Sequence, residues 1–252
     1  GHRWSSPPRT RLRSHRSESL ISRTSCMVVR MGRVDYVQAW ELQRRIHEHV
    51  AEGLLSNVLL MVEHPHVYTL GRRGKLNDVL ASAAQLEVLG AEVHHTDRGG
   101  EVTYHGPGQL VGYPIVDVRA WGGGPLRYVR TLEDALVATL ADFGIRAERG
   151  ERPTGVWVGD AKVAAIGVKI SRGVTTHGFA LNVDPDLSYF DHIVPCGIPG
   201  AQVASMSSLM SEAISVEQVA PVLAQHFGAA FGWAVQLATE EELGLPRESM
   251  VV

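Results

Sequence analysis

The sequence has few cysteines, few lysines and no long apolar run. Its 252 residues include only two cysteines, Cys26 and Cys196. Two cysteines are too few for a disulfide framework and are typical of a reducing compartment. No apolar run approaches the roughly 20 residues that a membrane-spanning helix needs. We therefore expect a soluble chain with neither a disulfide-stabilised scaffold nor a membrane anchor.

Residues 1–26 differ in composition from the rest of the chain. They hold six arginines, seven serines and a single acidic residue, Glu18. Such a segment buries too little apolar surface to offset its ordering entropy, and we predict that it is disordered. It resembles a transit peptide, but the opening Gly-His favours an extension ahead of a start at Met27 or Met31. A transit peptide would place the protein in the mitochondrial matrix, and an extension would place it in the cytoplasm.

Without this tail the chain is acidic. The whole chain has 24 Lys+Arg and 27 Asp+Glu, and removing six arginines and one glutamate leaves 18 and 26, a net charge of −8. General nucleic-acid binding depends on neutralising phosphates, so an acidic body argues against it. The length and the 44% apolar composition fit one sizeable globular domain, with two small domains as the alternative. We predict a single catalytic domain over residues 27–252.

Helical and strand-like patterns alternate along this body. Asp35 and Gly53 bracket a helical repeat, and Gly90 and Gly144 end two further helices. The two-residue loop Gly159-Asp160 predicts a hairpin within a three-stranded meander. Helices are predicted at 35–53, 82–90, 126–143 and 215–231, and strands at 57–64, 67–70, 110–118, 155–158, 161–170, 174–183 and 234–237. A turn at residues 64–66 is predicted to fold the second strand back on the first. Together these elements indicate an α/β or α+β domain.

The segment 97–118 reads DRGGEVTYHGPGQLVGYPIVDV. No other segment of the chain places so many conformational constraints in so few positions. Five of its residues are glycines, which suggests special φ values or a close approach of the main chain to something. We interpret it as strand, turn and strand around a polar cleft that is lined by backbone. The alternative is a glycine-rich hairpin that carries a surface histidine.

Cys196 is the only cysteine in the predicted body, and it lies in Val-Pro-Cys-Gly-Ile-Pro-Gly. Proline and glycine place it on a constrained loop, where reactive groups are often found. It is therefore a candidate nucleophile. The alternative is a small buried apolar residue, which is what a free cysteine usually is.

Lys162 is one of only three lysines, with Lys75 and Lys169. The two-residue period of a strand puts it on a face with Ala164, Ile166 and Val168. A lysine on an apolar face is costly unless it is paired or functional. The alternative is a lysine at the end of a strand that reaches solvent.

The sequence offers little support for a metal or a nucleotide. The neighbouring pairs His64/His66 and His94/His95 lack the acidic or cysteine partners of a zinc site. The glycine-rich segment lacks the Gly-Lys-Ser/Thr ending of a P-loop and contains no GxGxxG. We expect no metal and no cofactor.

Three motifs resemble those of the lipoyl(octanoyl) transferases. They are RGG-x-x-TYHGPGQ-x-x-x-YP from Arg98 to Pro114, AKVAAIGVKISRGVTTHGFALNV at 161–183 and VPCGI at 194–198. The motifs occur in the family's order, and the resemblance spans roughly residues 32–238. It implies the fold of the biotin and lipoate protein ligases, in which a mixed sheet is backed by helices and a smaller sheet lies alongside.

The resemblance also implies the site. Cys196 and Lys162 match the family's catalytic pair, a Cys-Lys dyad. The matching substrate-binding positions lie in three stretches, namely Arg98, Gly99, Gly100, Glu101, Val102, Thr103, Tyr104 and His105, then Ala165, Ile166 and Gly167, and then His177, Gly178, Phe179 and Ala180. A core histidine that is held by hydrogen bonds is the alternative for His177.

The function implied is an octanoyltransferase of lipoate synthesis. Its donor would be octanoyl-acyl carrier protein, and its acceptors would be lysines on the lipoyl domains of 2-oxoacid dehydrogenase complexes and on the glycine cleavage H protein. The alternatives are an ATP-dependent lipoate or biotin ligase of the same fold, a non-catalytic lipid- or cofactor-binding domain, and, with less support, a papain-like hydrolase.

Overall fold

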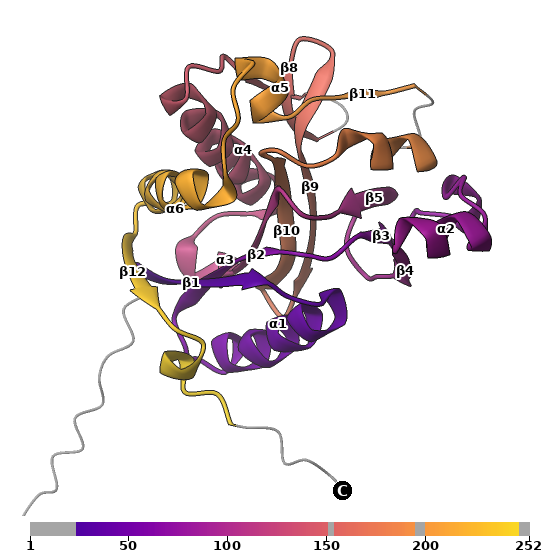
Figure 1. Ribbon diagram of the computed structural model, residues 1–252. Coiled ribbons are helices and arrows are strands. Elements are labelled where there is room, and N and C mark those ends of the chain that lie inside the picture. The colour runs from indigo at the N-terminus through magenta and orange to yellow at the C-terminus, as the bar shows by residue number, and fades with distance from the viewer. Residues whose placement is uncertain (1–23, 151–153, 195–199, 247–252) are drawn as a thin grey trace, which may run out of the picture.

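A large mixed sheet forms the centre of the fold in a computed structural model that describes residues 24–150, 154–194 and 200–246. In these ranges its strand order is β12-β1-β2-β6-β10-β9-β8-β7, and β11 pairs with β9 (Figure 1). The strands are β1 Ser25–Arg33, β2 Asn57–Glu63, β6 Gln109–Ile115, β7 Glu148–Arg149, β8 Gly155–Val158, β9 Ala161–Ser171, β10 Val174–Asn182, β11 Gln202–Val203 and β12 Ala234–Ala238.

A smaller sheet lies beside the large one, as predicted. Its order is β4-β3-β5, formed by Glu92–His95, Val67–Leu70 and Val102–His105. The predicted fold-back of residues 67–70 onto 57–64 was wrong, because β3 pairs with β4 and β5 rather than with β2. The turn after His64 therefore carries the chain from one sheet to the other.

Helices cover both faces of the large sheet. The helix α1, Tyr36–Ala51, packs on one face, and α4, Pro125–Asp142, and α6, Val216–Phe231, pack on the other (Figure 1). The shorter helices are α2 Ala83–Leu89, α3 Val118–Trp121 and α5 Met206–Met210, with 3₁₀ turns at Leu76–Asp78, Leu187–His192 and Glu241–Leu243. No helix in the described ranges is long and apolar enough to cross a membrane.

The predicted helix ends are confirmed by their caps. Asp35 accepts the amides of Val37 and Gln38, and Ser82 forms a capping box with Gln85. Gly90 ends α2 in the left-handed conformation, and Gly144 follows α4 with a φ of 75°. These residues satisfy backbone groups that a helix leaves unpaired at its termini.

The predicted tail boundary at residue 26 falls inside β1. Ser25 and Cys26 pair with Ala234 and Val235 of β12, and Cys26 is fully buried. These two residues belong to the sheet because a parallel strand far along the chain pairs with them, which local composition does not reveal. The predicted disorder of residues 1–23 lies outside the described residues.

Candidate active site

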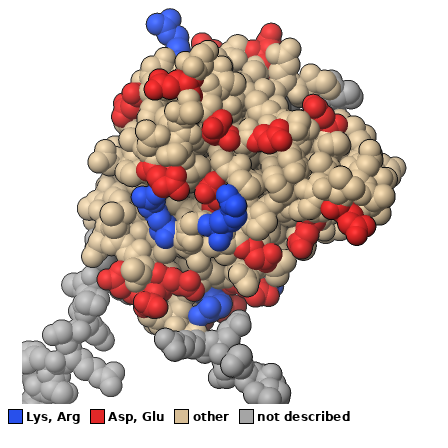
Figure 2. Space-filling model, viewed as in Figure 1, with Lys and Arg blue, Asp and Glu red and all other residues tan. Residues whose placement is uncertain are grey.

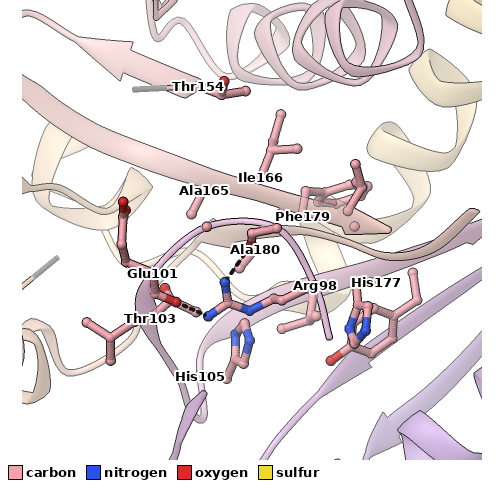
Figure 3. Close-up of a pocket in the computed structure, with 18 of the residues that line it drawn as sticks. Arg98, Glu101, Thr103, His105, Thr154, Ala165, Ile166, His177, Phe179 and Ala180 are labelled. Carbon is pink, nitrogen blue, oxygen red and sulfur yellow. Dashed lines mark hydrogen bonds between the residues drawn. The ribbon is translucent and has the colours of Figure 1, made fainter. Parts of the chain in front are cut away.

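A cavity of about 640 Å³ opens between the large sheet and the segment that leads into the small sheet. Its volume is that of a small-molecule site. Fifteen of its lining residues were predicted from the sequence. They include Lys162 and the three stretches 98–103 with 105, 165–167 and 177–180 (Figure 3). The lining residues that were not predicted to bind substrate are Tyr36, Arg73, Val111, Tyr113, Val129, Thr154 and Val168.

The glycine-rich segment folds over the cavity through Arg98. This buried guanidinium donates hydrogen bonds to the carbonyl of Thr69 at 2.7 Å and to those of Gly99 and Glu101, each at 2.9 Å. The amide of Gly99 donates to Val168 O on β9 at 2.9 Å, and Gly100 has a φ of 92°. Arg98 therefore holds the loop in place from within, and the predicted special backbone conformation is confirmed at Gly100.

Lys162 is buried and lies on a different strand face from the one predicted. The β8–β9 register shifts between Val156 and Trp157, so that Val163 and Ala164 both enter the main core. This bulge turns Lys162 to the side of Ala165 and Ala180, with which it lines a smaller adjoining pocket. The two-residue period fails because a β-bulge inserts one extra residue.

Two neighbours on β8 hold the side chain of Lys162. Its Nζ lies 5.0 Å from the centroid of the Trp157 ring, within the range of a cation–π interaction. A Cβ added to Gly155 would lie 3.3 Å from Lys162 Cε, so the glycine leaves room for the lysine stem. The contact fixes the ammonium near the wall of the cavity.

His177 is buried in the cavity wall, and its ring is held by an acidic group. Its Nε2 lies 2.7 Å from Asp97 Oδ1, and Asp97 Oδ2 accepts from Lys169 Nζ at 2.6 Å. Nε2 faces a carboxylate and therefore carries the proton. The other ring nitrogen, Nδ1, has no hydrogen-bond partner in the part of the chain that the structure describes. The hydrogen bond from His177 and then that from Lys169 hold the pKa of Asp97 below its usual range, whereas burial lowers the pKa of His177.

His105 is a neutral hydrogen-bond donor at the floor of the cavity. Burial lowers its pKa to about 3, and its Nδ1 donates to Gln109 Oε1 at 2.7 Å. Gln109 in turn donates from Nε2 to Asn182 Oδ1 at 3.0 Å. This chain of amides fixes the imidazole, so His105 shapes the cavity without carrying charge at neutral pH.

Tyr104 was predicted to bind substrate, but it does not line the cavity. It is fully buried in the core of the small sheet, where its hydroxyl lies 2.9 Å from His66 Nδ1. Thr103 and His105, its neighbours on β5, do reach the cavity. Successive side chains of a strand point to opposite faces, so Tyr104 points away from Thr103 and His105.

Cys196 lies outside the described residues. The chain is described again from residue 200, and Val203 in β11 pairs with Lys162, whose carbonyl accepts the amide of Ala204 at 3.0 Å. Across the described residues, no group of three or more His, Cys, Asp or Glu side chains could hold a metal ion.

Comparison with solved structures identifies the fold. A putative lipoate protein ligase from T. acidophilum with bound lipoic acid matches with a TM-score of 0.67 and 16% identity, covering 87% of this chain and 92% of that one. A lipoate-protein ligase A bound with ATP matches with a TM-score of 0.64 and 16% identity, covering 87% and 91%. The fold is therefore that of the lipoate protein ligases, and the mixed sheet with a smaller second sheet is confirmed.

The sequence then identifies the family. Residues 35–228 match the lipoyl protein ligase A/B catalytic domain, and this chain belongs to that family. A protein of Solibacter usitatus named octanoyltransferase is 50% identical over 207 residues, covering 82% of this chain and 93% of that protein. A protein of Gloeobacter violaceus with the same name is 49% identical over 208 residues, covering 82% and 90%.

Proposed function

We propose that this protein is an octanoyltransferase of lipoate synthesis. It takes an octanoyl group from an acyl carrier protein and passes it to a lysine of a lipoyl domain, such as those of 2-oxoacid dehydrogenases or the glycine cleavage H protein. The observation that carries the proposal is the cavity itself, in which Lys162 stands beside a surface of small residues, namely Ala165, Gly167, Gly178 and Ala180. Small side chains leave room for an acyl chain, and the similarity to named octanoyltransferases supports the chemistry.

In the first step the Sγ of Cys196 attacks the carbonyl carbon of the carrier thioester. The bond from that carbon to the carrier sulfur breaks, and the departing thiolate takes a proton from the Lys162 ammonium. A thiol of ordinary pKa is only about 3% thiolate at neutral pH, and a neighbouring cation raises that fraction. Lys162 thus serves first to favour the thiolate and then to protonate the leaving group.

In the second step the ε-amine of the acceptor lysine attacks the acyl group on Cys196. An amide bond forms, the bond to Sγ breaks, and neutral Lys162 accepts the proton that the new amide nitrogen loses. A thioester is already activated, so both steps proceed without ATP. Arg98, Gly99 and Gly100 cover the acyl chain, while His105 and His177 line its surroundings.

A transfer assay separates this function from an ATP-dependent ligase. Octanoyl carrier protein and a lipoyl domain are incubated without ATP, and in parallel free octanoate and the lipoyl domain are incubated with ATP. We expect octanoylation of the lipoyl domain in the first mixture only. Modification in the second mixture alone would mean that the chain is a ligase, and modification in neither would leave a non-catalytic binding domain.

A further inference from the structure

His177 has a backbone conformation that a strand residue rarely adopts. Its φ is 58°, in the left-handed region, although it lies within β10 and is not glycine. The other described non-glycine residues with a positive φ, Arg172 and Ser211, lie in a turn and at a helix end. Such outliers persist only where the surroundings enforce them, and they cluster at functional sites.

The neighbouring strand and helix enforce this conformation. Continuing the β6–β10 register, in which Gly112 faces Phe179, puts Pro114 opposite His177. Proline has no amide hydrogen to donate, and the carbonyl of Pro114 accepts the hydroxyl of Thr175 at 2.7 Å. The amide of His177 turns instead to α1 and donates to Gln43 Oε1 at 2.7 Å.

Because of this backbone conformation, the His177 ring lies on the opposite face of the sheet from the one that the two-residue period of β10 predicts. Phe179, two residues later, packs into the core beneath α4 and α6, whereas the His177 ring lies 5.7 Å from Trp40 on α1 and binds Asp97. Regular alternation would have placed both side chains on one face. The ring therefore stands on the face of the sheet where Lys162 and Ala165 lie.

On this face His177 and Tyr36 form the inner end of the cavity. Both are almost fully buried, whereas Arg73, which pairs with Glu101 at 3.3 Å, is exposed at the opposite end. Figure 3 shows Glu101 and His177 on opposite sides of Arg98. The cavity thus runs from an open, charged mouth to an end closed by two rings.

The distance to this end matches a medium acyl chain. The stem of Lys162 runs toward Ala165, because it packs on Gly155, which pairs with Ala165. His177 pairs with Val168, three residues further along β9, or about 10 Å at strand spacing. An extended octanoyl chain spans about 9 Å from its first to its last carbon, whereas a dodecanoyl chain spans about 14 Å.

We propose that His177 is the wall that limits the length of the acyl chain. Resting on the proposed function, the inference assigns a specificity-determining role to this side chain. Eight carbons extend from the Lys162 end to the ring, and longer chains meet it. The position of the ring is fixed because the His177 amide binds Gln43 and the ring contacts Asp97 and Trp40. Lys169 in turn holds Asp97 in place.

The variant His177→Gly tests this proposal. Glycine adopts a φ of 58° without strain, so the substitution removes only the imidazole ring. Transfer from carrier proteins loaded with eight- and twelve-carbon chains is measured, and the ratio of the two kcat/KM values is compared between variants. That ratio does not depend on the fraction of folded enzyme. In the wild type we expect a preference for eight carbons of about 100-fold, typical of shape discrimination in an apolar site. In His177→Gly we expect this preference to shrink at least about tenfold.

Ile166→Ala is the matched control, because it removes volume from the same cavity on the opposite face of β9. It should leave the preference unchanged. An unaltered preference in His177→Gly, or an equal change in Ile166→Ala, overturns the assignment of the wall. Failure of the wild type to transfer any chain contradicts the proposed function itself.

Discussion

At the scale of single residues, Lys162 is the group on which the proposed chemistry depends most. It is buried, it rests on the Trp157 ring, and β11 returns to its backbone soon after the sequence position of Cys196. A buried ammonium is stable only with compensating partners. A thiolate would be such a partner, and its own pKa would fall in return.

Replacing Lys162 by Met keeps the length of the side chain and removes the charge. We expect the pKa of the Cys196 thiol to rise by one unit or more toward about 8.5, with loss of transfer activity. The rate of iodoacetamide alkylation against pH measures this. Burial raises the pKa of Cys26 to about 12, so the reaction reports Cys196 alone.

Lys162→Arg is the control for this measurement. Arginine keeps the positive charge but does not readily release a proton. It should preserve the alkylation profile of the wild type and still transfer poorly. If the profiles of the wild type and Lys162→Met coincide, Lys162 is not the partner of Cys196.

Two buried histidines make the stability of the protein depend on pH. Burial lowers the pKa of His64 to about 4 and that of His105 to about 3. In the unfolded chain both have a pKa of about 6.5, so below that pH the unfolded state binds protons that the native state does not. Stability is therefore complete above about pH 6.5 and falls as the pH decreases toward the native values.

Between pH 7 and pH 5 we expect the free energy of unfolding to fall by about 2 kcal/mol for each of these histidines. Urea denaturation at a series of pH values measures the change. His64→Gln should flatten the dependence, whereas His95→Gln, at an exposed site, should leave it as it is. A free energy of unfolding that does not change over this range contradicts the assignment of neutral, buried imidazoles.

At the scale of elements, α1 completes a hydrogen-bond ladder that β6 leaves open. The carbonyl of Pro114 in β6 accepts the Thr175 hydroxyl, and Gln43 of α1 supplies the acceptor for the His177 amide. Gln43 is fully buried where it accepts the His177 amide. The helix is thus part of the cavity wall as well as part of the core.

Gln43→Ala should destabilise the fold by about 1–3 kcal/mol, because it leaves the His177 amide buried and unpaired. The change in unfolding free energy, measured by urea denaturation, checks this value. Gln38→Ala on the exposed side of the same helix is the control and should change stability far less. Equal effects of the two substitutions would show that helix propensity, rather than the bond to His177, dominates.

At the scale of the whole molecule, we propose that residues 25–246 form one domain. The strand β1 pairs with both β2 and β12, so segments near the two ends of this range lie in one sheet. The face in Figure 2 carries more acidic than basic side chains, in keeping with the charge of the sequence. Limited proteolysis should therefore release one stable fragment that contains both β1 and β12.

Local patterns predicted the parts of the fold that depend on near neighbours. The meander β8–β9–β10 follows from turn residues such as Gly159, and the helices follow from caps such as Asp35 and Ser82. The partners of β1 and β3 were missed because their pairing is decided by strands far along the chain. Sequence period cannot specify such long-range pairing.

The residues of the candidate site were predicted mainly from sequence motifs. Where the structure differs from these predictions, the cause is local. The predicted face of Lys162 was wrong because of a bulge, and Tyr104, which was predicted to bind substrate, lies in the core of the small sheet. Tyr36 was missed because it lies next to a helix cap and carries no motif. Val111 and Tyr113 could have been found from the two-residue period of β6, which places them on one face.

The intact mass of the protein after mixing with octanoyl carrier protein, without ATP or acceptor, tests the covalent mechanism most directly. We predict that the wild type and Cys26→Ser each gain one octanoyl group, that hydroxylamine removes it, and that Cys196→Ser gains none. An adduct that persists in Cys196→Ser, or a wild type that remains unmodified while it still transfers octanoate, would contradict the mechanism.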